Sequence, residues 1–144
     1  MRGGPATPGI AYGVEPSLSA AEFRRVLLSS GLIARRPGDD PERLARILAG
    51  ANLIVTARAL VPERNLVGVA RVLTDFAWCA YVSELAVDRA VQGRGIGRRL
   101  IEIVREKTGP EVAVMLTAAP GSEAFYERIG MPRLPNAFRF DRES

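Results

Sequence analysis

The sequence predicts a single domain with an α/β (α+β) fold, built on a mixed, mostly antiparallel sheet. Three stretches rich in apolar and β-branched residues, at 52–60, 66–73 and 78–87, are separated by short turns, which favours an antiparallel meander. A helical pattern lies between residues 78–87 and the apolar run 111–117, so these two strands are expected to pair in parallel. A chain of 144 residues suits one such domain with a substantial core.

Before the meander, the chain is expected to form a short strand at residues 10–14 and then two helices. The first helix covers residues 19–29 and opens with a capping box, in which Ser19 and Glu22 satisfy free N–H groups of the first turn. The second covers residues 40–50 and opens with Asp-Pro, because Asp caps well and Pro fits the first helical position.

After the meander, an amphipathic helix is expected at residues 96–107, with its apolar side chains on one face. The buried strand 111–117 follows, and then a short helix at residues 122–129 that ends at Gly130. The segment Phe138-Arg139-Phe140 is expected to close the sheet.

Residues 1–9 are expected to form a flexible N-terminal tail, and residues 10–144 the domain itself. The tail is rich in Gly and Pro and lacks the apolar core of a secretion signal. No apolar run approaches the roughly 20 residues needed to cross a membrane, so no membrane partner is expected. Because Cys79 is the single cysteine, an internal disulfide is excluded and a cytoplasmic location is the default expectation.

Charge and composition argue against several functions. The net charge is +4, but the basic residues are scattered and no basic run is interleaved with aromatics, so nucleic acid is not an expected partner. The chain has no His, which excludes histidine metal sites and the usual Ser/His and Cys/His nucleophile pairs. With no His to activate it, Cys79 is expected to be a small buried residue rather than a nucleophile.

The segment Gln92-Gly93-Arg94-Gly95-Ile96-Gly97, between a strand and a helix, is the main functional signal. Its three glycines let the backbone turn sharply and approach a ligand, and the start of the helix offers free N–H groups that suit a phosphate. Arg94, Arg98 and Arg99 add fixed positive charge. The segment does not fit a Walker loop, because Arg98-Arg99 follows Gly97 in place of Lys-Ser/Thr. It does not fit a dinucleotide fingerprint either, because the third glycine would be Arg98 or Leu100. The alternative is a glycine turn that joins a strand to a surface helix.

The pattern Gln-x-x-Gly-x-Gly, after a strand that reads Leu-Ala-Val-Asp, resembles the pyrophosphate loop of the GNAT superfamily of N-acetyltransferases. A second segment, Phe125-Tyr126-Glu127-Arg128-Ile129-Gly130-Met131, is similar to the family's Phe-Tyr-Glu-x-Leu-Gly-Phe. The order of elements over residues 10–141 also resembles this family. The resemblance implies a sheet with helices on both faces and a splayed pair of parallel strands at the cofactor site.

The resemblance further implies acetyl-CoA as co-substrate, with no metal. The glycine loop would hold the pyrophosphate, while the pantetheine arm would pair with the strand edge at Leu85 and Val87, where a bulge splays the strands. A backbone N–H near Leu85 or Ala86 would polarise the thioester carbonyl. Core packing is the alternative for Leu85 and Val87, and both can hold. The expected cofactor-binding residues are Leu85, Ala86, Val87, Gln92, Gly93, Arg94, Gly95, Ile96, Gly97 and Arg98.

Two residues are candidates for the proton transfers of acetyl transfer to an amine. Tyr126 is the candidate acid, because a phenol with a pKa near 10 can protonate a departing thiolate. The alternative is a tyrosine at the rim of a cleft with its hydroxyl in water. Glu84, on the cofactor strand, is the candidate base. Its alternative is a strand carboxylate paired with an arginine.

The expected function is acetyl-CoA-dependent transfer of an acetyl group to a primary amine, by direct attack in a ternary complex. A non-catalytic acyl-CoA-binding or regulatory module on the same fold is the alternative. The acceptor is expected to be a small-molecule or peptide amine, bound partly by the loop 31–39. The charges there, Arg35, Arg36, Asp39 and Asp40, are mixed in sign and indicate no substrate charge. A monomer and a homodimer both fit the sequence.

Overall fold

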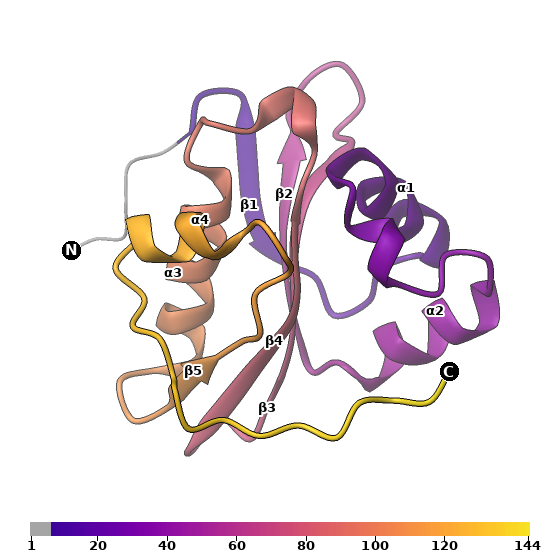
Figure 1. Cartoon of the computed structure of the whole chain (residues 1–144). Coiled ribbons are helices and arrows are strands. Elements are labelled where there is room, and N and C mark those ends of the chain that lie inside the picture. Colours follow the sequence, from indigo (N-terminus) through magenta and orange to yellow (C-terminus); the bar gives the residue numbers. More distant parts are fainter. Residues whose placement is uncertain (1–6) are drawn as a thin grey trace.

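The structure is a computed structural model that describes residues 7–144, so most of the expected tail at 1–9 lies outside the described residues. Within this range five strands form one sheet in the order β1-β2-β3-β4-β5 (Figure 1). The first four pair antiparallel, and β5 pairs in parallel with β4, as the sequence predicts. The strands are β1 (Ile10–Val14), β2 (Leu53–Ala59), β3 (Leu66–Thr74), β4 (Cys79–Val87) and β5 (Ala113–Met115).

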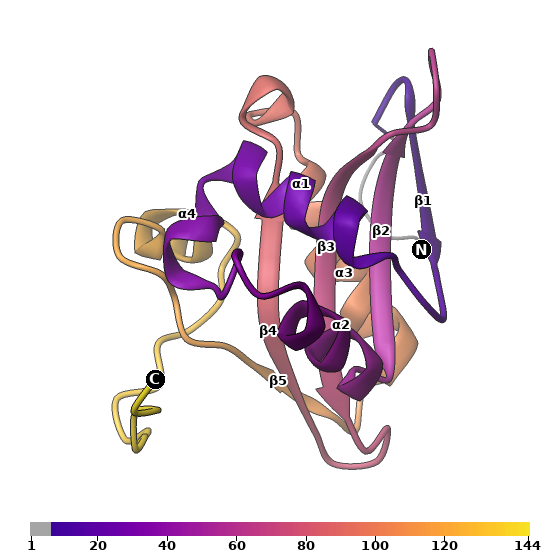
Figure 2. The ribbon, with the colours of Figure 1, turned by 90° about the vertical axis from the view of Figure 1, so that its right-hand side faces the viewer.

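Helices lie on both faces of this sheet. In Figure 1 the sheet is seen nearly edge-on, with α1 and α2 on its right and α3 and α4 on its left. Figure 2 shows the same sheet from the side of α1 and α2, with α4 beyond the edge of β4. The helices are α1 (Ala20–Ser30), α2 (Pro41–Gly50), α3 (Ile96–Thr108) and α4 (Glu123–Arg128), with short 3-10 turns η1 (Leu32–Arg35) and η2 (Arg89–Val91).

Each face of the sheet has its own apolar core. On one face Leu100 and Val104 of α3 are buried against strand residues such as Val55 and Val72. On the other face the apolar side chains of α1 and α2 pack against the sheet, and Phe23 of α1 is fully buried. Burying one such side chain contributes about 1.5–3 kcal/mol, so the two layers together fix the sheet in place.

The helix starts follow the sequence prediction, with one difference. The Asp40 side chain accepts the Arg43 N–H (3.0 Å) and caps α2, with Pro41 in its first turn. The Ser19 Oγ accepts the Glu22 N–H (3.1 Å), which is half of the expected capping box. The other half does not form, because the Glu22 carboxylate binds Arg58 (2.7 Å) instead of the backbone. An arginine is the stronger partner for a carboxylate.

A β-bulge in β4 decides which side chains face which layer. Arg71 lies opposite Glu84, but the next residue of β3, Val72, lies opposite Val82, so Ser83 is the extra residue. A shift by one residue exchanges the two faces of a strand. Val82 accordingly packs in the core under α3, whereas Leu85 takes over that face beyond the bulge. Glu84 is thereby turned toward the layer of α1 and α2.

Two expectations near the sheet edge are wrong. Strand β5 has only three residues instead of 111–117, and Phe138-Arg139-Phe140 is not a strand. Phe138 and Phe140 are almost fully exposed, at 97% and 104%. The physical reason is that so short a neighbour offers few ladder hydrogen bonds to a sixth strand. Instead, residues 132–144 cross the open side of the molecule toward α2 (Figure 1), where Arg43 Nη2 donates to the Ser144 carbonyl (3.1 Å).

Cys79 also differs from its expected environment. It begins β4 beside the turn that follows β3, and its side chain is exposed rather than buried. The Asp75 carboxylate holds this turn in place, because it accepts the backbone N–H groups of Ala77, Trp78 and Cys79.

Candidate functional site

The sheet opens between its two parallel strands. Pairing of β4 with β5 ends at Tyr81 and Met115, and beyond it no strand of residues 7–144 pairs with β4 on this side. Figure 2 shows the chain after β5 turning away from β4. The opening leads into a cleft of about 1870 Å³ that is lined by β4, the glycine loop, residues 116–122, η1 and α4. The splayed pair implied by the family resemblance is therefore present.

The glycine loop lies at one end of this cleft. Gly93 and Gly95 have φ of +82° and +84°, a left-handed conformation that side chains with a Cβ rarely adopt. A Cβ on either would have no atom of the described chain within 4 Å. Gly95 is the N-cap of α3 and provides no side-chain hydrogen bond, so the first N–H groups of α3 are left for other partners. Gly95, Ile96 and Gly97 all line the cleft.

Gly97 has a different task from the one that the sequence suggests. Its φ is ordinary, and a Cβ there would lie 3.0 Å from the Phe125 ring. Gly97 is therefore the contact that lets α4 pack against the first turn of α3. This contact positions the next residue of α4, Tyr126.

The polar side chains of the loop point to the protein itself. The Gln92 amide donates to the Val87 carbonyl (3.0 Å) and ties the loop to the end of β4. Arg94 donates to the Pro8 carbonyl (2.6 Å). Arg98 lines the cleft and lies 3.5 Å from Glu102. Ligand binding by Gln92, Arg94 and Arg98 stays a prediction, although Gln92 and Arg98 line the cleft beside the backbone of Gly93 and Gly95.

Tyr126 lines the cleft from α4 and is partly buried. Its ring meets Phe125 edge to face, with centroids 5.0 Å apart. The structure gives its hydroxyl no hydrogen bond with residues 7–144. Burial raises the pKa of Tyr126 to about 12, so its phenol carries a proton at neutral pH. Tyr126 therefore keeps the proton that the acid role requires, although the raised pKa makes it a weaker acid, and the acid role stays a prediction.

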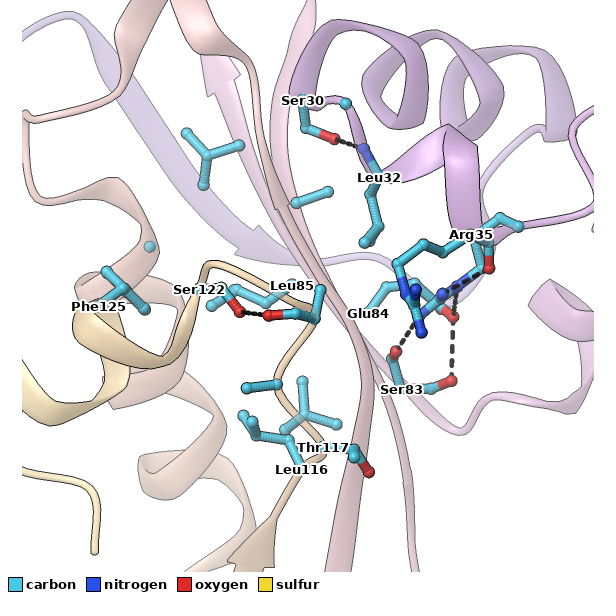
Figure 3. Close-up of a pocket in the computed structure, with 18 of the residues that line it drawn as sticks. Ser30, Leu32, Arg35, Ser83, Glu84, Leu85, Leu116, Thr117, Ser122 and Phe125 are labelled. Atoms are coloured by element: carbon cyan, nitrogen blue, oxygen red, sulfur yellow. Dashed lines mark hydrogen bonds and ion pairs between the residues drawn. The ribbon is translucent and has the colours of Figure 1, made fainter. Parts of the chain in front are cut away.

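Glu84 lies on the opposite side of β4 from α4 (Figure 3). It is buried, at 2% exposure, and four donors surround its carboxylate. Oε1 accepts from Arg71 Nε, while Oε2 accepts from Arg36 Nε (2.8 Å), Ser83 Oγ (3.0 Å) and Arg71 Nη2 (3.2 Å). Burial alone would raise the pKa of Glu84, but the hydrogen bond and charge of Arg71 and the charge of Arg36 hold it below its ordinary value.

This environment does not favour the predicted base role of Glu84. A carboxylate has about four acceptor positions, and here four donors fill them. A lowered pKa also makes it a weaker acceptor of an amine proton. The structure matches the alternative from the sequence, a strand carboxylate paired with arginine, because the bulge at Ser83 turns Glu84 toward Arg36 of the η1 segment.

Sequence reasoning did not single out Arg71. It is 6% exposed, and its Nη1 donates to the Ile47 carbonyl of α2 (2.7 Å). The signal was available, because Arg71 is the one charged residue in the apolar strand Leu66–Thr74. A charge in a buried strand almost always has a partner.

The structure offers no metal site of the usual kind. Within residues 7–144, no group of three or more Cys, Asp or Glu side chains is placed to hold an ion. Over the same residues, none of the helices combines the length and the apolar character that a membrane crossing requires.

A family model described as an acetyltransferase (GNAT) domain matches residues 40–141. The class of protein is thus a transferase with an acetyltransferase fold. Because the match covers well over half of the chain, the chain belongs to the GNAT family. No curated protein sequence is similar enough to count as a match.

Solved structures of other acetyltransferases share this fold. A candidate acetyltransferase from Deinococcus radiodurans is 26% identical, with a TM-score of 0.71 over 98% of this chain and 94% of that one. A GNAT family acetyltransferase from Streptococcus pneumoniae is 18% identical, with a TM-score of 0.71 over 93% and 99%. A ribosomal-protein-alanine N-acetyltransferase from Brucella melitensis is 20% identical, with a TM-score of 0.65 over 92% and 98%. The last two, at such low identity, show the fold alone.

Proposed function

We propose that the protein transfers an acetyl group from acetyl-CoA to a primary amine by direct attack within a ternary complex. The observation that carries this proposal is that three elements meet in one cleft. These are the unpaired side of β4, the open start of α3 at Gly95, and the protonated phenol of Tyr126. In that order they suit the amide-rich pantetheine arm, the pyrophosphate and the leaving thiolate of acetyl-CoA.

The chain's own groups would act in order on bound acetyl-CoA and the acceptor. Backbone N–H groups at the start of α3 bind the pyrophosphate, and the side of β4 beyond the bulge pairs with the pantetheine arm. A backbone N–H of β4 at Leu85 or Ala86 polarises the thioester carbonyl. The amine nitrogen then bonds to the acetyl carbon, the C–S bond breaks, and the sulfur takes the proton of Tyr126, whose phenolate recovers a proton from solvent.

The proton of the attacking amine goes to solvent in this proposal. Glu84 is already bonded to Arg36, Arg71 and Ser83, so we assign it a positioning role on β4. The cleft is open and wide enough to admit water. Free amine, rather than ammonium, is therefore the reactive form, and the rate should rise with pH toward the pKa of the acceptor.

Thiol release from acetyl-CoA in the presence of an amine panel tests the proposal. Cys79 is exposed and would itself react with a thiol reagent, so the Cys79→Ser protein is the appropriate parent. We expect thiol release that depends on the amine, with the acetylated amine identified by mass. Binding of acetyl-CoA without turnover of any amine would favour a non-catalytic acyl-CoA-binding module.

Thermal unfolding tests the ligand separately from the reaction. A ligand that binds only the folded state stabilises it by about 2.7 kcal/mol at a hundredfold excess over its Kd. Acetyl-CoA should therefore raise the Tm clearly, whereas NAD and ATP should raise it much less. Equal shifts from all three would indicate non-specific anion binding and contradict the assigned cofactor.

A further inference from the structure

The loop before α2 carries basic and acidic residues, and the structure places only the basic ones at the cleft. Arg35 and Arg36 line the cleft, whereas Asp39 and Asp40 do not, and Asp40 is used to cap α2. Glu84 is the one acidic side chain that lines the cleft within residues 7–144. The basic side chains that line it are Arg35, Arg36, Arg43, Arg71, Arg89, Arg98, Arg128, Arg139 and Arg142.

Glu84 cannot neutralise even its own neighbours. Its single negative charge faces Arg71 and Arg36, whose side chains are 7% and 21% exposed. Guanidinium groups stay charged in proteins. The cluster of Arg36, Arg71 and Glu84 therefore keeps one positive charge that no carboxylate of the cluster balances. A charge held away from water is costly unless an opposite charge approaches it.

This surplus lies on the acceptor side of β4, away from the loop proposed for pyrophosphate. Figure 3 shows Arg35, Ser83 and Glu84 on one side of β4, with Ser122 and Phe125 on the other. Arg35 adds to the surplus, because its side chain is exposed and the structure gives it no ion pair with residues 7–144. Arg139 adds little, because Asp141 pairs with it at 2.9 Å.

We propose that the acceptor amine carries an anionic group, a carboxylate or a phosphate, which the surplus positive charge around Arg35 and Arg36 attracts. This inference rests on the proposed function and names the class of its acceptor. A cationic acceptor such as a diamine or a polyamine would instead be repelled. The anion would lie toward η1, so that the amine can point along β4 to the thioester.

Matched acceptors test this preference. The pairs are 4-aminobutyrate with 4-aminobutanamide, 2-aminoethyl phosphate with ethanolamine, and a short peptide with Asp after its free α-amine with the same peptide containing Asn. Rates are compared at equal concentrations of free amine, since the two members of a pair differ in amine pKa. We expect kcat/KM to favour the anionic member by about tenfold at low salt, and the preference to shrink as ionic strength rises. The pair with the larger preference tells carboxylate from phosphate.

An Arg35 series then locates the effect. Arg35→Gln should reduce the preference several-fold by lowering kcat/KM for the anionic member alone, and Arg35→Lys should retain most of it. Arg46→Gln is the matched control, because Arg46 is also exposed, lies on α2 and does not line the cleft. Circular dichroism and Tm should be unchanged in all three.

The outcomes distinguish this inference from the proposed function. Equal or faster acetylation of the neutral members, or of a diamine, overturns the inference and leaves the proposed function standing. An unchanged preference in Arg35→Gln also overturns it. Acetylation of no amine by a protein that binds acetyl-CoA overturns the proposed function, and the acceptor class with it.

Discussion

The two sides of the cleft are built in different ways. On the side of α3 and α4, the site is formed by backbone groups of residues that are close together in the sequence, with the turn at Gly93 and Gly95 leading directly into a helix. On the side of η1 and α2, the site is formed by side chains from distant parts of the sequence, such as the cluster of Arg36, Arg71 and Glu84. The first kind of site leaves a short sequence pattern, whereas the second becomes visible only after folding.

Strand β4 joins these two sides through one residue. The extra residue Ser83 exchanges the faces of the strand, so Glu84 faces η1 while Leu85 packs on the side of α3. Four variants should separate what the two sides contribute.

Tyr126→Phe should affect the chemistry of the α4 side alone. The change removes one O–H and almost no volume, so the contact with Phe125 and the affinity for acetyl-CoA should persist. Turnover should fall by a factor on the order of 10²–10⁴ if proton transfer limits the rate. Single-turnover kinetics and calorimetry measure the two quantities. An unchanged rate would assign protonation of the thiolate to water.

Glu84→Gln should affect the stability of the η1 side. Removing the carboxylate leaves Arg36 and Arg71 without their shared partner, and breaking a buried ion pair costs about 3–5 kcal/mol. Urea unfolding measures the loss. The control is Glu127→Gln, which breaks an exposed pair with Arg133 and should cost less than about 1 kcal/mol. A fully stable Glu84→Gln protein that is inactive only at low pH would instead support the base role.

The same carboxylate gives a prediction for pH. The folded-state pKa of Glu84 lies below its ordinary value of 4.5, so its stabilising contribution is present above about pH 4.5 and is lost as pH falls further. Arg58 lowers the pKa of Glu15 and Glu22 in the same direction. The free energy of unfolding should therefore decrease with acidification below pH about 4.5, and less steeply in Glu84→Gln.

Gly95→Ala should weaken the cofactor side without touching the acceptor side. A left-handed Ala costs about 1–2 kcal/mol of stability, and its Cβ would enter open space at a residue that lines the cleft. Gly109→Ala is the control for stability, because Gly109 also has a positive φ (+93°) and lies at the far end of α3. With a ψ of 170° its backbone is even less open to Ala, so its loss of stability should be at least as large. Both should lose stability, but only Gly95→Ala should lose affinity for acetyl-CoA, by about tenfold or more. Equal affinities in the two variants would contradict the phosphate-loop assignment.

Cys79→Ser should change neither side. Cys79 lies at the start of β4 and does not line the cleft, although its Sγ is 4.0 Å from Asp75 Oδ2. We expect kcat, KM and Tm to stay within error of those of the protein that keeps Cys79, with turnover followed by the mass of the acetylated amine. A loss of turnover would show that the thiol has a role that its position does not explain.

The sequence was sufficient for most of the fold and for less of the site. Short turns, helix caps and apolar runs are local, and they correctly placed β1 to β4 and α1 to α4. Phe138 and Phe140 have the right alternation for a strand, but strand formation depends on a neighbour, and β5 offers only three residues.

The environment of Glu84 depends on the bulge and on Arg36, which lies 48 positions away in the chain, so no local pattern could predict it. Gly97 looks like its neighbours in sequence, and only the Phe125 ring reveals its separate task.

The unpaired side of β4 has a further consequence, for association between molecules. An exposed strand edge is a template on which strands of other chains can assemble, and it is a common origin of aggregation. In this protein that edge is recessed behind α4 and residues 116–122. A single extended chain needs less room beside β4 than a folded sheet does, because only its own backbone has to reach the strand. A recess that would admit a pantetheine arm therefore also limits the pairing of other strands with this edge of β4.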